Sequence, residues 1–207
     1  MQKQKNLRIL VECAAMTALA AVFSMIKIWE SPLGGSVTLF SMVPIIIIAL
    51  RHGYIWGFCT AFIYSATQFL FDAGKLSAWG IAGAKAMIVC VLFDYIIAFT
   101  ILGAAGFFKF AFEGSGTRNK KIIFASAAVL LVCLLRYASH VFAGAVVWYE
   151  ITKAGNWNEY VHTVGAWVYS IVYNIQYMLP ETAITLIAAP AAVTALSAVG
   201  KRDRTNN

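Results

Sequence analysis

A few ionisable side chains of this 207-residue chain lie inside long apolar stretches, where a charge is costly. They are Lys85, Asp94, Arg136, His140 and Glu181, with Glu12 nearer to the end of its stretch. A charged group in the middle of a membrane-spanning helix costs about 2.5–3.5 kcal/mol on insertion scales. Such groups therefore face a cavity or a partner and are the first candidates for chemistry. The alternative is that they only pair helices together, which applies best to Lys85 and Arg136.

His140 shares a predicted helix with Arg136 and Trp148. The three positions fall within about one-third of the helix surface, because each residue turns the helix by about 100°. Trp148 lies roughly 12 Å along the axis from His140 at 1.5 Å per residue. A single buried histidine is more often structural than a ligand, but this grouping favours a shared site.

A second polar cluster follows in the last apolar stretch. Its members are Tyr169, Ser170, Tyr173, Asn174, Gln176, Tyr177 and Glu181. An aromatic belt at the membrane surface accounts for the tyrosines, but not for the amides and the carboxylate on neighbouring turns. We interpret both clusters as the lining of an outward-opening pocket for a flat, nitrogen-rich cation. Aromatic faces attract cations, and carboxylates accept hydrogen bonds from amino groups.

The composition indicates which elements must position these residues. The chain is 61% hydrophobic and 12% charged, whereas a soluble domain is about 45–50% apolar and about 25% charged. This excludes a soluble enzyme, a nucleic-acid-binding module and a disordered tail. We expect an all-α integral membrane protein with a single transmembrane domain over residues 1–207, in contact with the lipid bilayer. Its six helices are expected at about 9–28, 37–50, 54–71, 78–108, 122–148 and 164–199, from the length needed to cross the bilayer.

The connections and the basic residues complete this topology. Trp29 to Ser36 is predicted to be a loop because it holds Pro32 and two glycines, and Pro180 is expected to kink the last helix. With six spans, most of the sixteen lysines and arginines fall on the side of the two termini. Both termini are therefore predicted to be cytoplasmic. The residues on that side are Lys3, Lys5, Arg8, Arg51, Lys109, Arg118, Lys120, Lys121, Lys201, Arg202 and Arg204.

The sequence carries no motif for catalysis or for a cofactor. It has no phosphate-binding Gly-x-x-x-x-Gly-Lys-Ser/Thr loop, no His-Glu-x-x-His and no Gly-x-Ser-x-Gly. The four cysteines lie far apart in apolar runs and indicate neither a metal site nor a disulfide framework. We therefore expect no catalytic residues, no metal and no cofactor. A transporter subunit or a facilitator fits better than an enzyme.

Several motifs, in their order and placement, resemble a known family. They are similar to the substrate-binding S components of energy-coupling factor (ECF) vitamin transporters, and specifically to the thiamine-specific branch, ThiT. The likeness extends over nearly the whole chain. The motifs are Ser41-Met42-Val43-Pro44, Arg51-His52-Gly53, Asp94-Tyr95, Arg136-x-x-x-His140-x-x-x-Gly144-x-x-x-Trp148 and Tyr169-Ser170-x-x-x-Asn174-x-x-Tyr177-x-x-Pro180-Glu181.

The resemblance implies a fold and a ligand site. It implies six helices with both termini inside and a pocket roofed by the loop from Trp29 to Ser36. Trp148 would stack on the pyrimidine ring of thiamine. Asp94 stands where the family has glutamate and is one methylene shorter, so Glu181 is a candidate to share its role. The implied ligand-binding set is Trp148, His140, Asn174, Tyr169, Asp94, Tyr95, Glu181, Tyr177 and Trp29.

The resemblance also implies partners. The family associates with a transmembrane coupling protein, the T component, and with two ATPase subunits that drive uptake across the bacterial cell membrane. Ala14 and Ala18 form a small-xxx-small pair, which permits close helix approach. The pair matches the family's docking face, although packing within the bundle is the alternative. Two other functions stay open, namely an S component for another vitamin or precursor such as hydroxymethylpyrimidine, and a stand-alone facilitator.

Overall fold

The computed structural model describes residues 2–32, 34–76 and 78–205, with side chains for residues 3–198 in these ranges. Residue 33 of the predicted loop, and residues 1, 77, 206 and 207 of the predicted domain, lie outside the described residues. The side chains of Lys201, Arg202 and Arg204, which were counted for the topology, also lie outside the described part.

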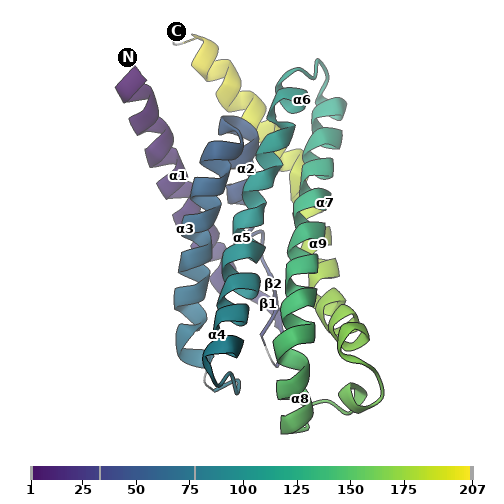
Figure 1. The fold of residues 1–207 in the computed structure, drawn as a ribbon. Coiled ribbons are helices and arrows are strands. Elements are labelled where there is room, and N and C mark those ends of the chain that lie inside the picture. The colour runs from purple at the N-terminus through teal and green to yellow at the C-terminus, as the bar shows by residue number, and fades with distance from the viewer. Residues whose placement is uncertain (1, 33, 77, 206–207) are drawn as a thin grey trace.

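Six helical rods form the described part of the molecule, as the sequence predicts (Figure 1). The fourth and fifth rods each combine several segments of different helical pitch. The first three and the last are α1 (Gln2–Met25), α2 (Val43–His52), α3 (Tyr54–Asp72) and α9 (Ala166–Thr205). The fourth runs through α4 (Ala84–Cys90), η2 (Val91–Ile97), α5 (Ala98–Thr100), η3 (Ile101–Phe108) and α6 (Lys109–Glu113). The fifth comprises α7 (Arg118–Ala143), η4 (Gly144–Trp148) and α8 (Tyr149–Gly155), and the short turns η1 (Ala73–Lys75) and η5 (Glu159–His162) lie in connections.

Four of these rods are long and apolar enough to cross a membrane. Among the described residues they cover Lys3–Met25, Ala84–Glu113, Arg118–Gly155 and Ala166–Ala198. Figure 1 shows both termini at the end of the bundle where α6 lies, with α4 and α8 at the opposite end. The shared end of the termini agrees with the arrangement of basic residues in the sequence.

The second predicted span, 37–50, is only partly helical. Ser36–Thr38 forms a strand, and the helix α2 begins at Val43, so it has ten residues. Most of its isoleucines are buried by neighbouring rods. Its core side, with Ile45 and Ala49, belongs to the same buried cluster as Leu102 of η3, against which α2 packs. Between helices in a membrane, this close van der Waals packing supplies the stabilisation that the hydrophobic effect supplies in water.

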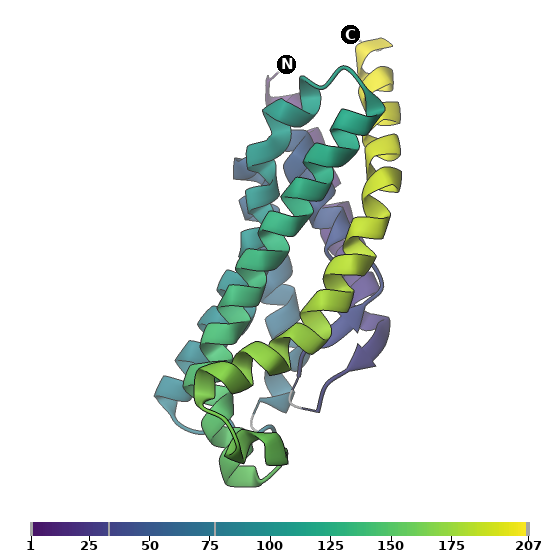
Figure 2. The same cartoon turned by 90° about the vertical axis from the view of Figure 1, so that its right-hand side faces the viewer.

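The segment predicted as a loop contains most of a β-hairpin. Strand β1 (Lys27–Glu30) pairs with β2 (Ser36–Thr38) in an antiparallel register that places Trp29 opposite Val37. The Pro and Gly residues that predict a loop form the hairpin turn, in which the Gly34 N–H donates to the Ser31 carbonyl at 3.1 Å. The hairpin lies beside α9 in the half of the molecule away from the termini (Figure 2).

Helix α9 is a single helix of 40 residues that continues through Pro180 and Pro190. Figure 2 shows that it bends rather than breaks, as expected where proline removes a backbone donor and crowds the preceding turn. Its first half crosses over α7, where the Ser170 hydroxyl donates to the Val141 carbonyl at 2.7 Å. The bend therefore brings the polar cluster of the last helix next to His140.

Candidate ligand-binding site

A cavity of about 380 Å³ lies in the half of the bundle away from the termini. This volume is typical of sites for small molecules, which occupy about 300–1,000 Å³. The walls come from the hairpin, from α1, α3, η1, η2, α5, α7, η4 and α9, and from Trp79 in the connection before α4. Seven of the nine predicted ligand-binding residues line the cavity. They are Asp94, Tyr95, His140, Trp148, Tyr169, Asn174 and Tyr177.

Two π-helical segments position the polar residues of the site. Asp94 and Tyr95 lie within η2, and Trp148 is the last residue of η4. A π-turn adds a residue to the helical turn and rotates the side chains that follow, which is why such turns recur at functional sites. The rotation cannot be read from a regular 100° periodicity, so the sequence did not reveal these segments.

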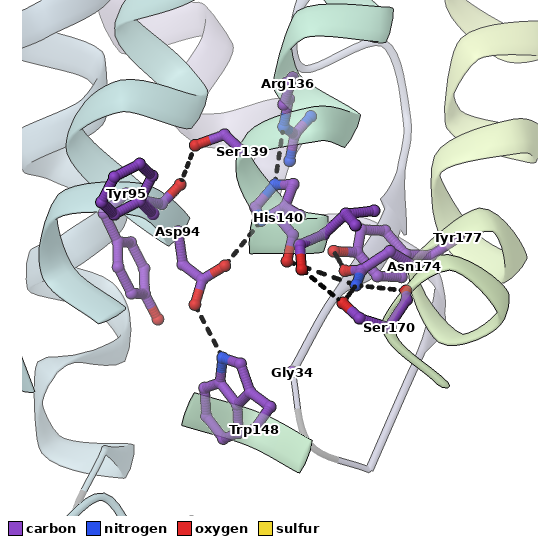
Figure 3. Close-up of polar contacts among 12 residues, drawn as sticks. Gly34, Asp94, Tyr95, Arg136, Ser139, His140, Trp148, Ser170, Asn174 and Tyr177 are labelled. Carbon is purple, nitrogen blue, oxygen red and sulfur yellow. Dashed lines mark hydrogen bonds and ion pairs between the residues drawn. The ribbon is translucent and has the colours of Figure 1, made fainter. Parts of the chain in front are cut away.

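A chain of hydrogen bonds connects the fourth and fifth rods through the cavity (Figure 3). The Arg136 Nε–H donates to His140 Nε2 at 3.3 Å, so the His140 ring accepts at this nitrogen. Its proton is therefore on Nδ1, which donates to Asp94 Oδ1 at 2.9 Å. The Trp148 indole N–H donates to Asp94 Oδ2 at 2.7 Å. Asp94 thus orients both rings, with one carboxylate oxygen for each.

Arg136 is buried at the inner end of this chain. Its guanidinium lies over the Phe99 ring at 4.3 Å from the centroid, and Nη1 donates to Met42 Sδ at 3.0 Å. Through the His140 ring it is connected to the opposite charge of Asp94. Lys85 lies exposed in the first turn of α4, at the start of the apolar stretch Ala84–Glu113.

Asn174 closes the opposite side of the cavity. Its Nδ2 donates to the Ser170 carbonyl at 2.8 Å and to the His140 carbonyl at 3.4 Å. Its Oδ1 accepts the Tyr177 hydroxyl (Figure 3). The carbonyl acceptors and the tyrosine donor therefore fix the orientation of the amide. One lone pair of Oδ1 remains to accept a hydrogen bond from a ligand.

Gly144, the first residue of η4, permits the close approach of the fifth rod to α9. A Cβ atom at Gly144 would lie 2.1 Å from Ser170 Oγ and 3.0 Å from Asn174 Nδ2. Because these atoms belong to the cavity wall, a methyl group here would displace the amide of Asn174.

We expect Gly144→Ala to weaken ligand binding by about tenfold, since overpacking typically costs about 1–3 kcal/mol and tenfold corresponds to about 1.4 kcal/mol. The measurement is a ligand titration of the purified variant. Gly116→Ala is the matched control, because a Cβ there would meet nothing within 4 Å. Equal affinities of the two variants would contradict the assigned role.

The outer rim of the cavity contains residues that the sequence did not single out. Lys75 donates to Asp72 Oδ1 at 2.8 Å, and this hydrogen bond raises the pKa of the Lys75 ammonium. Trp79 meets Trp148 edge-on at 6.1 Å between centroids. Lys27 of the hairpin also lines the cavity. Charges at helix ends are ordinary in a membrane protein, so only the tertiary structure distinguishes these residues.

The hairpin forms one wall of the cavity through its second half. Gly34, Gly35 and Ser36 line the space. Gly35 has a φ of +84°, and a Cβ there would lie 2.5 Å from the Tyr177 ring. The backbone of the hairpin therefore packs directly on the aromatic face of α9.

Two predicted ligand residues lie outside the cavity. Trp29 is 42% exposed on β1, and Glu181 is buried with its carboxylate turned to Thr38 of β2. Gln176, a member of the predicted polar cluster, is exposed. On α1, Ala14 and Ala18 are exposed, whereas Cys13 and Thr17 face the bundle. The small-residue pair is thus available on the surface of the described structure.

Comparisons with known proteins agree on one family. The family model described as "Thiamine transporter protein (Thia_YuaJ)" matches residues 10–199. The thiamine transporter ThiT of Bacillus subtilis (strain 168) is 33% identical over 192 residues, covering 90% of this chain and 91% of that protein. ThiT of Lacticaseibacillus paracasei is 23% identical over 198 residues, covering 94% and 90%. A solved structure of ThiT from Listeria monocytogenes aligns with a TM-score of 0.73 at 25% identity, covering 92% of this chain and 96% of that one.

Proposed function

The chain belongs to the thiamine transporter protein family, and from this premise we propose that it captures thiamine outside the cell with the cavity described above. It is a multi-pass bacterial membrane protein and an S component, from a family of transport proteins rather than enzymes. The observation that carries the proposal is the cavity, in which Asp94 orients Trp148 and His140 opposite the tyrosines of α9.

Thiamine fits the chemistry of these walls. Its cationic thiazolium ring suits the faces of Tyr169 and Tyr173, because aromatic faces attract cations, and its pyrimidine ring can stack on Trp148. Its aminopyrimidine ring carries an amino group, which can donate to Asp94 Oδ atoms or to Asn174 Oδ1. We therefore propose the seven residues in the cavity as ligand contacts. Glu181 and Trp29 are not included.

We further propose that the chain works with the ECF coupling protein and two ATPase subunits. The resemblance to S components supports this assignment, and the exposed Ala14 and Ala18 offer a surface for a closely packed helix. The sequence has no Gly-x-x-x-x-Gly-Lys-Ser/Thr loop that could bind the phosphates of ATP. The energy for uptake would then come from the partner subunits.

A fluorescence titration of the purified protein tests thiamine binding. Trp79 and Trp148 line the cavity, so thiamine is expected to quench tryptophan fluorescence saturably at nanomolar to micromolar concentrations. Trp148→Phe should remove much of the quenching. Trp157→Phe is the control, since Trp157 is 47% exposed outside the cavity. Quenching by hydroxymethylpyrimidine but not by thiamine would replace thiamine with that precursor as the ligand.

A further inference from the structure

Glu181 is buried, at 2% exposure, next to Pro180 in the bend of α9. Both carboxylate oxygens face Thr38, the last residue of β2. Oε2 accepts the Thr38 backbone N–H at 2.6 Å, and Oε1 accepts the Thr38 hydroxyl at 2.7 Å. The Ser41 hydroxyl lies 2.6 Å from Thr38 Oγ1 and 3.5 Å from Oε1. We propose that Glu181 is a positioning residue that fixes the hairpin to α9 and so builds a wall of the cavity without touching the ligand.

The Thr38 N–H needs such an acceptor because the hairpin has two strands, which pair with each other along one edge only. Among the described residues, no further strand pairs with the outer edge of β2, yet Thr38 is only 6% exposed. A backbone N–H that is buried within a membrane protein without a partner costs several kcal/mol. The carboxylate of Glu181 takes the place of the missing strand at this position.

Two further contacts anchor the hairpin on the same face of α9. The Tyr173 hydroxyl donates to the Gly34 carbonyl at 3.2 Å and accepts the Ser31 hydroxyl. Gly35 packs on the ring of Tyr177. Tyr173, Tyr177 and Glu181 are spaced by four residues, which places them in one row along the helix. The contact of Glu181 is with Thr38, which lies two residues beyond the cavity-lining Ser36.

The geometry separates this role from direct ligand contact. Glu181 is absent from the cavity lining, and its oxygens are occupied by donors from one residue of the hairpin. If Glu181 acts through the hairpin, then removing its partner must have the same effect as removing the carboxylate. If Glu181 instead contacts the ligand directly, replacing Thr38 should leave ligand binding unchanged.

The test compares variants of the full chain by thiamine titration, so this part rests on the proposed function. Glu181→Gln and Thr38→Val should each weaken binding by about tenfold, which is about 1.4 kcal/mol, mainly through faster ligand dissociation. The double variant should be no weaker than the weaker-binding single variant. Thr38→Ser keeps both donors and should restore near-normal affinity. Thr185→Val is the matched control, because it removes a buried hydroxyl that donates to the backbone carbonyl of Glu181 and not to the hairpin.

A measurement without ligand keeps the inference independent of thiamine. Backbone hydrogen exchange over residues 34–41 should be faster in Glu181→Gln and Thr38→Val than in the wild type and Thr185→Val. If the wild type does not bind thiamine but exchange is still faster in Glu181→Gln and Thr38→Val than in the wild type, the anchor is supported and the proposed function is contradicted. Loss of binding in Glu181→Gln with normal binding in Thr38→Val, or unchanged exchange, would overturn the anchor. If Glu181→Gln does not fold, the Thr38→Val and Thr38→Ser pair decides.

Discussion

Replacing Asp94 with asparagine is expected to lower thiamine affinity by roughly a hundredfold, or about 3 kcal/mol. The carboxylate accepts the His140 Nδ1–H at one oxygen and the Trp148 Nε1–H at the other. An asparagine amide would present its own N–H groups to one of these donors. The variant would also remove the negative charge that balances Arg136 and attracts a cationic ring.

Two comparisons separate charge from geometry in this prediction. Asp72→Asn makes the same chemical change at the rim of the cavity, where the side chain is 25% exposed. Surface ion pairs are worth about 0.2–1 kcal/mol, so Asp72→Asn should weaken thiamine binding by at most about fivefold. Asp94→Glu keeps the charge but moves the carboxylate oxygens by one methylene. Its thiamine affinity should lie between those of Asp94→Asn and Asp72→Asn. Equal effects of Asp94→Asn and Asp72→Asn in the titration would show that Asp94 does not organise the site.

The sequence predicts the helices of this fold well because their signal is local. Long apolar stretches must form helices in a bilayer, since no other open structure pairs all backbone groups there. The hairpin was missed because its strands have four and three residues, and turn residues separate them. Its stability comes from contacts with α9, such as Thr38 to Glu181 and Tyr173 to Gly34, which no local pattern encodes.

The site was predicted in part for a similar reason. Helical periodicity gives the direction in which a side chain points. The residues that it grouped, His140 with Trp148 and Tyr169 with Tyr173 and Tyr177, line the cavity, but Gln176 of the second group is exposed. Periodicity does not say which other part of the chain packs against that side of the helix. Glu181 lies nearly in line with Asn174, seven residues later, but the space beside it is filled by Thr38. The rim residues Asp72 and Trp79 lie at the end of α3 and in the connection that follows it, and only the assembled bundle brings them to the cavity.

A tryptophan at Ala14 or Ala18 is expected to abolish ATP-driven thiamine uptake while leaving thiamine binding intact. Both alanines are exposed on α1, and the buried side of this helix is formed by residues such as Cys13 and Thr17. A small-xxx-small pair lets two helix backbones approach closely, and an indole at either position prevents that approach. The cavity uses only the far end of α1, at Ser24 and Met25, so the ligand site should be unaffected.

The two readouts distinguish docking from damage to the bundle. Binding is measured by titration of the purified variant, and uptake in cells that express the coupling protein and the ATPases. Ile187→Trp is the matched control, because Ile187 is 73% exposed on α9 and a large side chain there should be accommodated by lipid. Loss of binding in Ala18→Trp would place this face in the core of the bundle. Normal uptake by Ala14→Trp and Ala18→Trp would instead favour a facilitator that needs no partner, because only a subunit that receives energy from partner proteins depends on an open docking face. Thiamine flux into vesicles that contain this chain alone would favour the same conclusion.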